Sequence, residues 1–112
     1  MGYGAVGRLV AHYLEAFGSR ILVFDPYCQD NPGPVEMVDL PTLLKQSDIV
    51  SLHARLSDEN HHLIGRKELA QMKPSAVLIN TARSGLVDES ALIEALCQRQ
   101  IMGAALDVFE TE

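Results

Sequence analysis

The sequence predicts an α/β protein in which a parallel sheet is covered by helices on both faces. Three observations support this fold class. Apolar segments rich in branched residues alternate along the chain with amphipathic segments, which is typical of repeated strand–helix–strand units. Hydrophobic residues make up 47% of the 112 residues and charged residues 21%, so we expect one packed domain rather than a disordered chain. A glycine-rich turn stands directly before the first amphipathic segment.

The helices are predicted from apolar residues that recur with helical spacing. Four segments show this pattern: residues 8–17, 40–46, 65–72 and 88–100. Gly18 is expected to end the first helix, since glycine often stands just past a helix end. Pro41 fits the first turn of the second helix, and Pro74 marks the break after the third. Asp88 is expected to cap the last helix.

The strands are predicted from short runs of branched and apolar residues. Five segments have this composition: residues 21–25, 35–38, 48–53, 76–80 and 103–108. Residues 28–34 are expected to form a loop, residues 57–62 a loop or a helix start, and residues 81–87 a turn-rich connection. Strands that alternate with helices form parallel sheets with right-handed crossovers, which favours a doubly wound fold. In that fold ligands bind at the carboxyl ends of the strands.

The glycine-rich turn is the first candidate site. Gly2, Gly4 and Gly7 fit the pattern G-x-G-x-x-G. The first glycine permits a tight turn, the second lets the backbone approach a pyrophosphate, and the third lets the helix pack closely on the sheet. The helix N-terminus then offers unpaired N–H groups and a positive dipole end to the phosphates. We therefore predict that this turn, with Ala5 and Val6, binds a dinucleotide.

A carboxylate follows the next strand at a spacing typical of dinucleotide-binding folds. Asp25 lies 18 residues after Gly7 (25 − 7), close to the roughly 20 residues that this fold uses. It would accept hydrogen bonds from both ribose hydroxyls and repel a 2′-phosphate, which favours NAD over NADP. The alternative is a loop-forming glycine cluster with an aspartate that only ends a strand.

The glycine turn of this fold normally follows a strand, and here almost nothing precedes Gly2. We therefore expect a Rossmann-type, doubly wound parallel sheet that lacks its first strand. Residues 1–112 would then form an incomplete dinucleotide-binding domain from a longer protein.

Arg83 is the second candidate site. It follows the apolar segment at residues 76–80, so it should lie at the carboxyl end of a strand, facing the cofactor. Its planar guanidinium suits bidentate binding of a substrate carboxylate, and its charge can polarise a carbonyl during hydride transfer. From its position alone, an exposed loop arginine without a role is an equal alternative.

Seven motifs occur in order over nearly the whole chain: residues 2–8 (GYGAVGR), 23–26 (VFDP), 48–53 (DIVSLH), 72–74 (MKP), 80–83 (NTAR), 85–89 (GLVDE) and 103–110 (GAALDVFE). In this combination the sequence resembles the NAD-binding domain of the D-isomer-specific 2-hydroxyacid dehydrogenases, especially their phosphoglycerate dehydrogenase-like branch. The resemblance implies an NAD-dependent oxidoreductase that transfers a hydride to or from C2 of a 2-hydroxy or 2-oxo acid. It also implies a homodimer in the full-length protein.

The resemblance implies roles for particular residues. Arg83 matches the family's catalytic arginine, which binds the carboxylate and the carbonyl of the substrate. Glu112, 29 residues later (112 − 83), matches the glutamate that raises the pKa of a catalytic histidine. Asp107 matches an acidic residue near the nicotinamide, and Thr81 and Ala54 match positions that contact the cofactor. Asp25 matches the ribose-binding acid.

The sequence also departs from the family pattern. The family's catalytic histidine lies beyond the position of Glu112, and its substrate domain has no counterpart here, so we expect the 112-residue chain alone to be inactive. Arg55 stands where the family usually has proline, and Ser84 where it often has glycine. Two alternatives remain: a non-catalytic, NAD-sensing binding module like the C-terminal-binding corepressors, or the remnant of a truncated gene.

Composition argues against several other classes of function. The net charge of −6 disfavours nucleic acid as a partner, and apolar runs of about six residues are far too short to cross a membrane. Cys28 and Cys97 form neither a disulfide framework nor a metal motif, so we expect a cytoplasmic protein without metal. His61 and His62 are adjacent, and since neighbouring side chains on a helix or strand point different ways, we expect no shared metal.

Overall fold

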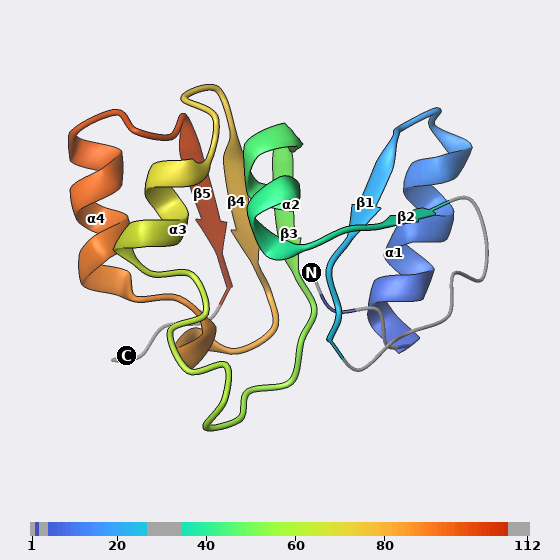
Figure 1. Ribbon diagram of the computed structural model, residues 1–112, viewed down its shortest axis with the longest axis horizontal. Coiled ribbons are helices and arrows are strands. Elements are labelled where there is room, and N and C mark those ends of the chain that lie inside the picture. Colours follow the sequence, from blue (N-terminus) through green and yellow to red (C-terminus); the bar gives the residue numbers. More distant parts are fainter. Residues whose placement is uncertain (1, 3–4, 27–34, 108–112) are drawn as a thin grey trace.

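The computed structural model of the chain describes residues 2, 5–26 and 35–107. Five strands form two parallel sheets in these residues, one of order β1–β2 and one of order β3–β4–β5 (Figure 1). The strands are β1 (Ile21–Val23), β2 (Val35–Met37), β3 (Ile49–Leu52), β4 (Val77–Asn80) and β5 (Gly103–Leu106). The helices are α1 (Ala5–Ala16), α2 (Leu40–Gln46), α3 (Arg66–Gln71), α4 (Glu89–Cys97) and the 3₁₀ helix η1 (Ser84–Leu86).

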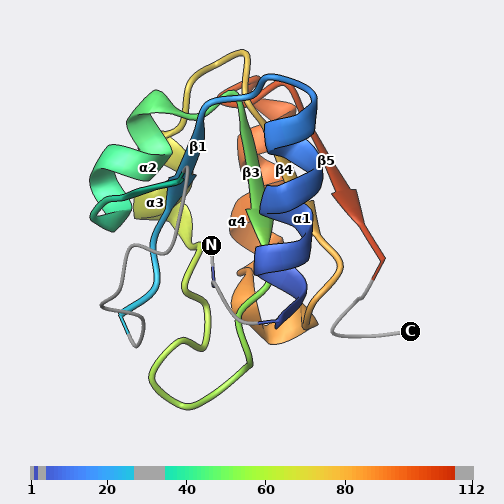
Figure 2. The same ribbon diagram turned by 90° about the vertical axis from the view of Figure 1, so that its right-hand side faces the viewer.

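Helices cover both sides of the strands. In Figure 2, α2 and α3 lie to one side of β3 and α1 lies to the other. The larger core includes Leu44, Ile64 and Leu78, whose side chains are fully buried. A smaller apolar cluster lies between α1, β1 and β2; its buried members are Ala11, Ile21, Val23 and Val35. The predicted α/β class, with parallel strands and helices on both faces, is confirmed.

Every predicted helix and strand is present, but most boundaries differ from the prediction. Helix α1 begins at Ala5 instead of residue 8, and β1 ends at Val23 instead of Asp25. Helix α4 ends at Cys97 instead of residue 100, because Arg99 adopts a left-handed φ of 58° that no α-helix continues through. For residues 57–62, where a loop or a helix start was expected, the loop is confirmed, since residues 58–62 form turns. The loop predicted at residues 28–34 lies outside the described residues.

Local hydrogen bonds fix two of the helix ends. Gly18 has a φ of 81°, and its N–H donates to the carbonyl of Glu15 at 2.8 Å, which ends α1 as predicted. At the start of α2, Oδ1 of Asp39 accepts a hydrogen bond from the N–H of Thr42 at 2.9 Å. Such a cap contributes about 1 kcal/mol to helix stability.

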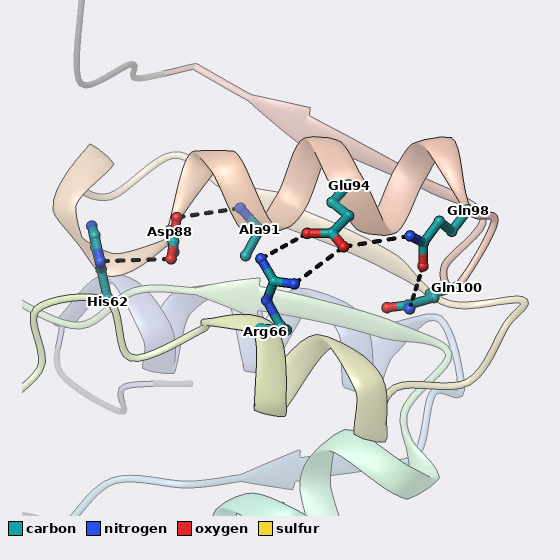
Figure 3. Close-up of polar contacts among 7 residues, drawn as sticks. All are labelled: His62, Arg66, Asp88, Ala91, Glu94, Gln98 and Gln100. Carbon is teal, nitrogen blue, oxygen red and sulfur yellow. Dashed lines mark hydrogen bonds and ion pairs between the residues drawn. The ribbon is translucent and has the colours of Figure 1, made fainter.

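Polar side chains join α3 to α4 on the outer surface (Figure 3). Nη2 of Arg66 lies 2.7 Å from Oε2 of Glu94 in an ion pair between the two helices. Asp88 caps α4 as predicted, since its Oδ1 accepts a hydrogen bond from the N–H of Ala91 at 3.2 Å. Its second oxygen lies 4.0 Å from Nδ1 of His62. We expect the cap to matter more than the ion pair, because exposed ion pairs contribute little.

Much of the apolar stripe on α1 is exposed in this structure. Leu9 is 53% exposed, Tyr13 59% and Phe17 85%, although the spacing of these residues is that of a buried helix face. Val10 and Leu14, on the neighbouring side of the helix, line a cleft instead. None of the helices in the described part of the chain is long and apolar enough to span a membrane.

That cleft, of about 520 Å³, runs between the two sheets. It is lined by residues 21–23 of β1 and residues 49–51 of β3. Consecutive strand residues point to opposite faces, so a cleft that reaches three in a row lies along the strand edges rather than on one face. The two edges belong to separate sheets, and no strand precedes α1 among residues 2, 5–26 and 35–107.

Candidate functional site

Five of the predicted site residues lie at the carboxyl ends of strands. Asp25 follows β1, Ala54 follows β3, Thr81 and Arg83 follow β4, and Asp107 follows β5. Gly2 lies between the ends of β1 and β3 at this edge, because its N–H donates to the carbonyl of Phe24 at 3.0 Å and a Cβ placed on it would meet the backbone of Ala54. In open α/β sheets this is the edge where ligands bind.

The glycine turn brings three backbone segments together. Gly2 has a φ of 85°, and a Cβ placed on it would lie 2.6 Å from the backbone nitrogen of Ala54. A Cβ on Gly7 would collide with the carbonyl oxygen of Gly2. Both positions therefore require glycine, the first for its left-handed backbone and both for close backbone approach. Gly4 lies outside the described residues.

The N-terminus of α1 is suited to a diphosphate. The helix has 12 residues and carries no acidic side chain in its first turn, where Val6 is exposed and Arg8 adds a positive charge. The unpaired N–H groups and the positive end of the helix dipole therefore face no competing carboxylate from this turn. Together with the glycine turn, these residues fit the phosphate-binding part of a dinucleotide. Ala5 begins the helix at this point.

Asp25 is partly exposed, two residues after the last residue of β1. The position is that of a carboxylate that receives ribose hydroxyls in this fold. It stands close in sequence to Phe24, whose carbonyl binds Gly2, so the glycine turn and the acid are joined through one short segment of backbone.

Arg83 follows β4 and is exposed, as is Thr81. Its Nη1 donates to the carbonyl of Ala82 at 2.7 Å, and its backbone is extended, with φ −146° and ψ 139°. Asp107 follows the neighbouring strand β5, and its N–H donates to the carbonyl of Asn80 at 3.1 Å. The structure therefore brings the ends of β4 and β5 together, with a cation after one and an acid after the other. Glu112 lies outside the described residues.

His53 lines the cleft beside Gly2 and Gly7. Its Nε2 lies 2.8 Å from Oγ of Ser51, and burial of the ring lowers the pKa of His53 below its ordinary value. A neutral imidazole in this position agrees with a structural or cofactor-lining role rather than that of an acid.

One geometric expectation was wrong. The rings of His61 and His62 stack, with centroids 4.0 Å apart and planes inclined by 21°. His62 has a φ of 53°, so the two residues belong to neither a helix nor a strand and the rule for side-chain directions does not apply. No group of three or more metal-ligating side chains occurs in the described part of the chain.

Sequence reasoning missed Asn80, the last residue of β4. Its side chain is 1% exposed and hydrogen-bonds to the backbone of Ala82 and Arg83. The available signal was an asparagine that ends an apolar strand just before a turn, because asparagine often bonds the backbone two residues later.

A glycine turn at a helix N-terminus, an acid after β1 and a cation on the same edge are features of a Rossmann-type dinucleotide-binding domain. A sequence model of the D-isomer specific 2-hydroxyacid dehydrogenase, NAD binding domain, matches residues 1–112. The chain belongs to this family, and NAD is the cofactor of this domain type. The resemblance indicated by the sequence motifs is thereby confirmed.

Similar proteins include several of known activity. Over 112 residues the chain is 44% identical to hydroxypyruvate reductase of Thermotoga maritima, covering 100% of this chain and 37% of that protein. It is 47% identical over 116 residues to glyoxylate reductase of Thermococcus litoralis, covering 100% of this chain and 35% of that protein. A crystal structure of a D-isomer specific 2-hydroxyacid dehydrogenase from Lactobacillus delbrueckii ssp. bulgaricus, in NAD complexed form, matches with a TM-score of 0.92 and 42% identity, covering 96% of this chain and 33% of that chain. The chain spans about a third of the length of these relatives.

Proposed function

We propose that this domain serves an NAD-dependent oxidoreductase that transfers a hydride between NAD(H) and C2 of a 2-hydroxy or 2-oxo acid. The observation that supports this proposal is the arrangement of residues at the carboxyl ends of the strands. Arg83 follows β4 and Asp107 follows the adjacent β5, on the edge that holds the glycine turn. The names of the relatives, hydroxypyruvate reductase and glyoxylate reductase, support small 2-oxo acids as the substrate class.

Each site residue has a role in this proposal. The backbone of the glycine turn and the N-terminus of α1 hold the diphosphate, with Ala5 and Val6 in the first turn. Asp25 accepts the ribose hydroxyls and disfavours a 2′-phosphate. Ala54, Thr81 and Asp107 line the path toward the nicotinamide. The bound NAD supplies the hydride acceptor.

Arg83 acts on the substrate. Its guanidinium forms two parallel hydrogen bonds to the carboxylate, and its charge stabilises the oxygen at C2 as negative charge develops there. Glu112 acts through the catalytic histidine of the family, whose pKa it raises.

The test is calorimetric titration of the chain with NAD, with NADP as the comparison ligand. Binding is the appropriate measurement because the chain spans only about a third of its relatives. We expect saturable binding that favours NAD, and an Asp25→Ala variant that binds NAD about tenfold more weakly, since hydrogen bonds to a charged group are worth about 1.5–3 kcal/mol. Asp58→Ala, a matched change at an exposed loop aspartate, should bind NAD as the unmodified chain does. Equal affinities of the two variants, or no saturable binding, would contradict the proposal.

We further propose that the full-length protein is a homodimer in the cytoplasm. The resemblance to the family supports the homodimer, and the exposed apolar stripe on α1, with Phe17 85% exposed, is a surface that a second copy or another segment of a longer chain can cover. Cys97, an exposed free thiol, supports a reducing compartment. Light scattering on the full-length protein tests the homodimer, and a monomer would contradict it. Cell fractionation tests the location, and recovery outside the cytoplasm would contradict it.

A further inference from the structure

Asn80 stands out among the residues that the structure describes as the one polar side chain in the buried core. Its Oδ1 accepts a hydrogen bond from the N–H of Ala82 at 3.1 Å, and its Nδ2 donates to the carbonyl of Arg83 at 2.9 Å. No buried side-chain nitrogen or oxygen in the described residues lacks a partner. The amide is therefore buried together with both of its bonds, which is the condition under which a polar group is tolerated in a core.

These two bonds fix the backbone of Arg83. The bond from Oδ1 to the N–H two residues later closes a tight turn directly after β4. The carbonyl of Arg83 also accepts a hydrogen bond from the N–H of Leu86 at 3.2 Å, at the start of η1. The Cα of Arg83 is thus held between the end of a buried strand and a 3₁₀ helix. Its exposed side chain, whose Nη1 bonds the carbonyl of Ala82, is the part that can turn toward a ligand.

The main chain of Asn80 fixes the second site residue. Its carbonyl accepts a hydrogen bond from the N–H of Asp107 at 3.1 Å, and in the sheet it pairs with Leu106 of β5 and Leu52 of β3. One buried residue therefore joins the segment that carries Arg83 to the segment that carries Asp107. The side-chain hydrogen bonds of Asn80 hold the segment that carries Arg83, and its main-chain hydrogen bond holds the segment that carries Asp107.

We propose that Asn80 is a positioning residue, which sets the Arg83 guanidinium at the correct place beside Asp107 for the carboxylate of the substrate. This inference rests on the proposed function of Arg83. Displacement of a binding group by about 1 Å can lower a rate by about a hundredfold. Hydrogen bonds that hold this turn from inside the core would therefore prevent such a displacement of Arg83. An apolar residue at position 80 would leave the N–H of Ala82 unsatisfied and would allow the turn to open.

The first experiment tests the hydrogen bonds without any ligand. Amide hydrogen exchange is followed by NMR in the chain, in Asn80→Ala and in the control Asn60→Ala. Asn60 makes the same two kinds of bond in another loop, accepting from the N–H of Ser57 and donating to the carbonyl of Arg55. We expect exchange at Ala82 to become at least tenfold faster in Asn80→Ala only.

The second experiment tests the effect on Arg83. Glyoxylate is titrated into the chain saturated with NAD⁺, and binding is measured rather than turnover. We expect Asn80→Ala to weaken glyoxylate binding about tenfold while NAD⁺ affinity changes less than twofold. In the Arg83→Ala background the same change should have no further effect on glyoxylate. A merely structural role would lower both affinities in either background.

Asn80→Ser keeps an acceptor for the N–H of Ala82 and should retain part of the glyoxylate affinity, so it carries the test if Asn80→Ala does not fold. The inference is overturned if exchange at Ala82 is no faster in Asn80→Ala than in Asn60→Ala, if Asn80→Ala binds glyoxylate as the unmodified chain does, or if its effect on glyoxylate persists without Arg83. Failure of the unmodified chain to bind NAD⁺ would instead overturn the proposed function, and exchange at Ala82 would still decide whether Asn80 holds the turn.

Discussion

Replacement of Gly7 by alanine tests the close packing on which the phosphate site depends. Gly7 is buried in the first turns of α1, and the added Cβ would collide with the carbonyl oxygen of Gly2, well inside the 3.0 Å that Cβ contacts keep. Gly2 is itself closely packed, since a Cβ placed on it would meet the backbone of His53 and Ala54. The helix and the sheet edge must therefore separate.

The expected cost follows from that geometry. Forcing one extra methyl group into a filled site typically destabilises a protein by about 1–3 kcal/mol. In a domain of this size each kcal/mol corresponds to roughly 4 °C in melting temperature, so Gly7→Ala should lower it by about 4–12 °C. Gly103→Ala is the matched control, since a Cβ there would meet no atom within 4 Å. We expect that change to be neutral or slightly stabilising.

The assay is thermal unfolding of the three proteins, followed by calorimetric titration of each with NAD. Gly7→Ala should also bind NAD at least tenfold more weakly, because the N-terminus of α1 moves away from the glycine turn. A melting temperature within 1 °C of the unmodified chain, together with equal affinity, would refute the reasoning from close packing.

Two further predictions concern stability. Asp88→Ala removes the cap of α4 and should cost about 1 kcal/mol, measured by urea unfolding, whereas Ser90→Ala in the same first turn should not destabilise; equal loss in both would contradict the capping argument. Burial holds the pKa of His53 below its ordinary value of about 6.5, so the unfolded chain binds the proton more readily. Stability should therefore fall as the pH drops through about 6.5, and His53→Gln should reduce that fall, measured as the free energy of unfolding at pH 7.5 and 5.5; an unchanged pH dependence would exclude His53 as its source.

The strands of the larger sheet could be predicted from the sequence because each is a short apolar run. The segment at residues 76–80 is continuously apolar until Asn80, and β4 occupies residues 77–80 of it. Helix caps were equally visible, since Asp88 has the residue type and the position that a cap requires. These features depend on neighbours in sequence.

The remaining features depend on groups that meet only in the folded chain. The stripe on α1 predicts a contact face, but its spacing cannot tell whether this chain covers Phe17. The stacking of His61 on His62 follows from one left-handed residue, which propensity does not reveal. The importance of Asn80 lies in two side-chain bonds and one main-chain bond, of which the last joins segments 27 residues apart (107 − 80).

The cleft between the sheets divides the molecule into two units that need not unfold together. The buried residues of α1, β1 and β2 form the smaller apolar cluster, whereas those of the rest of the described chain form the larger one, against which Leu22 of β1 also packs. The smaller unit buries less and should open more often, so its amides should exchange first. The glycine turn and Asp25 belong to that unit, and Arg83 and Asp107 belong to the other. A dinucleotide bound to both units would make them open together. Part of its binding free energy would then be measurable as slower amide hydrogen exchange in α1 and β1.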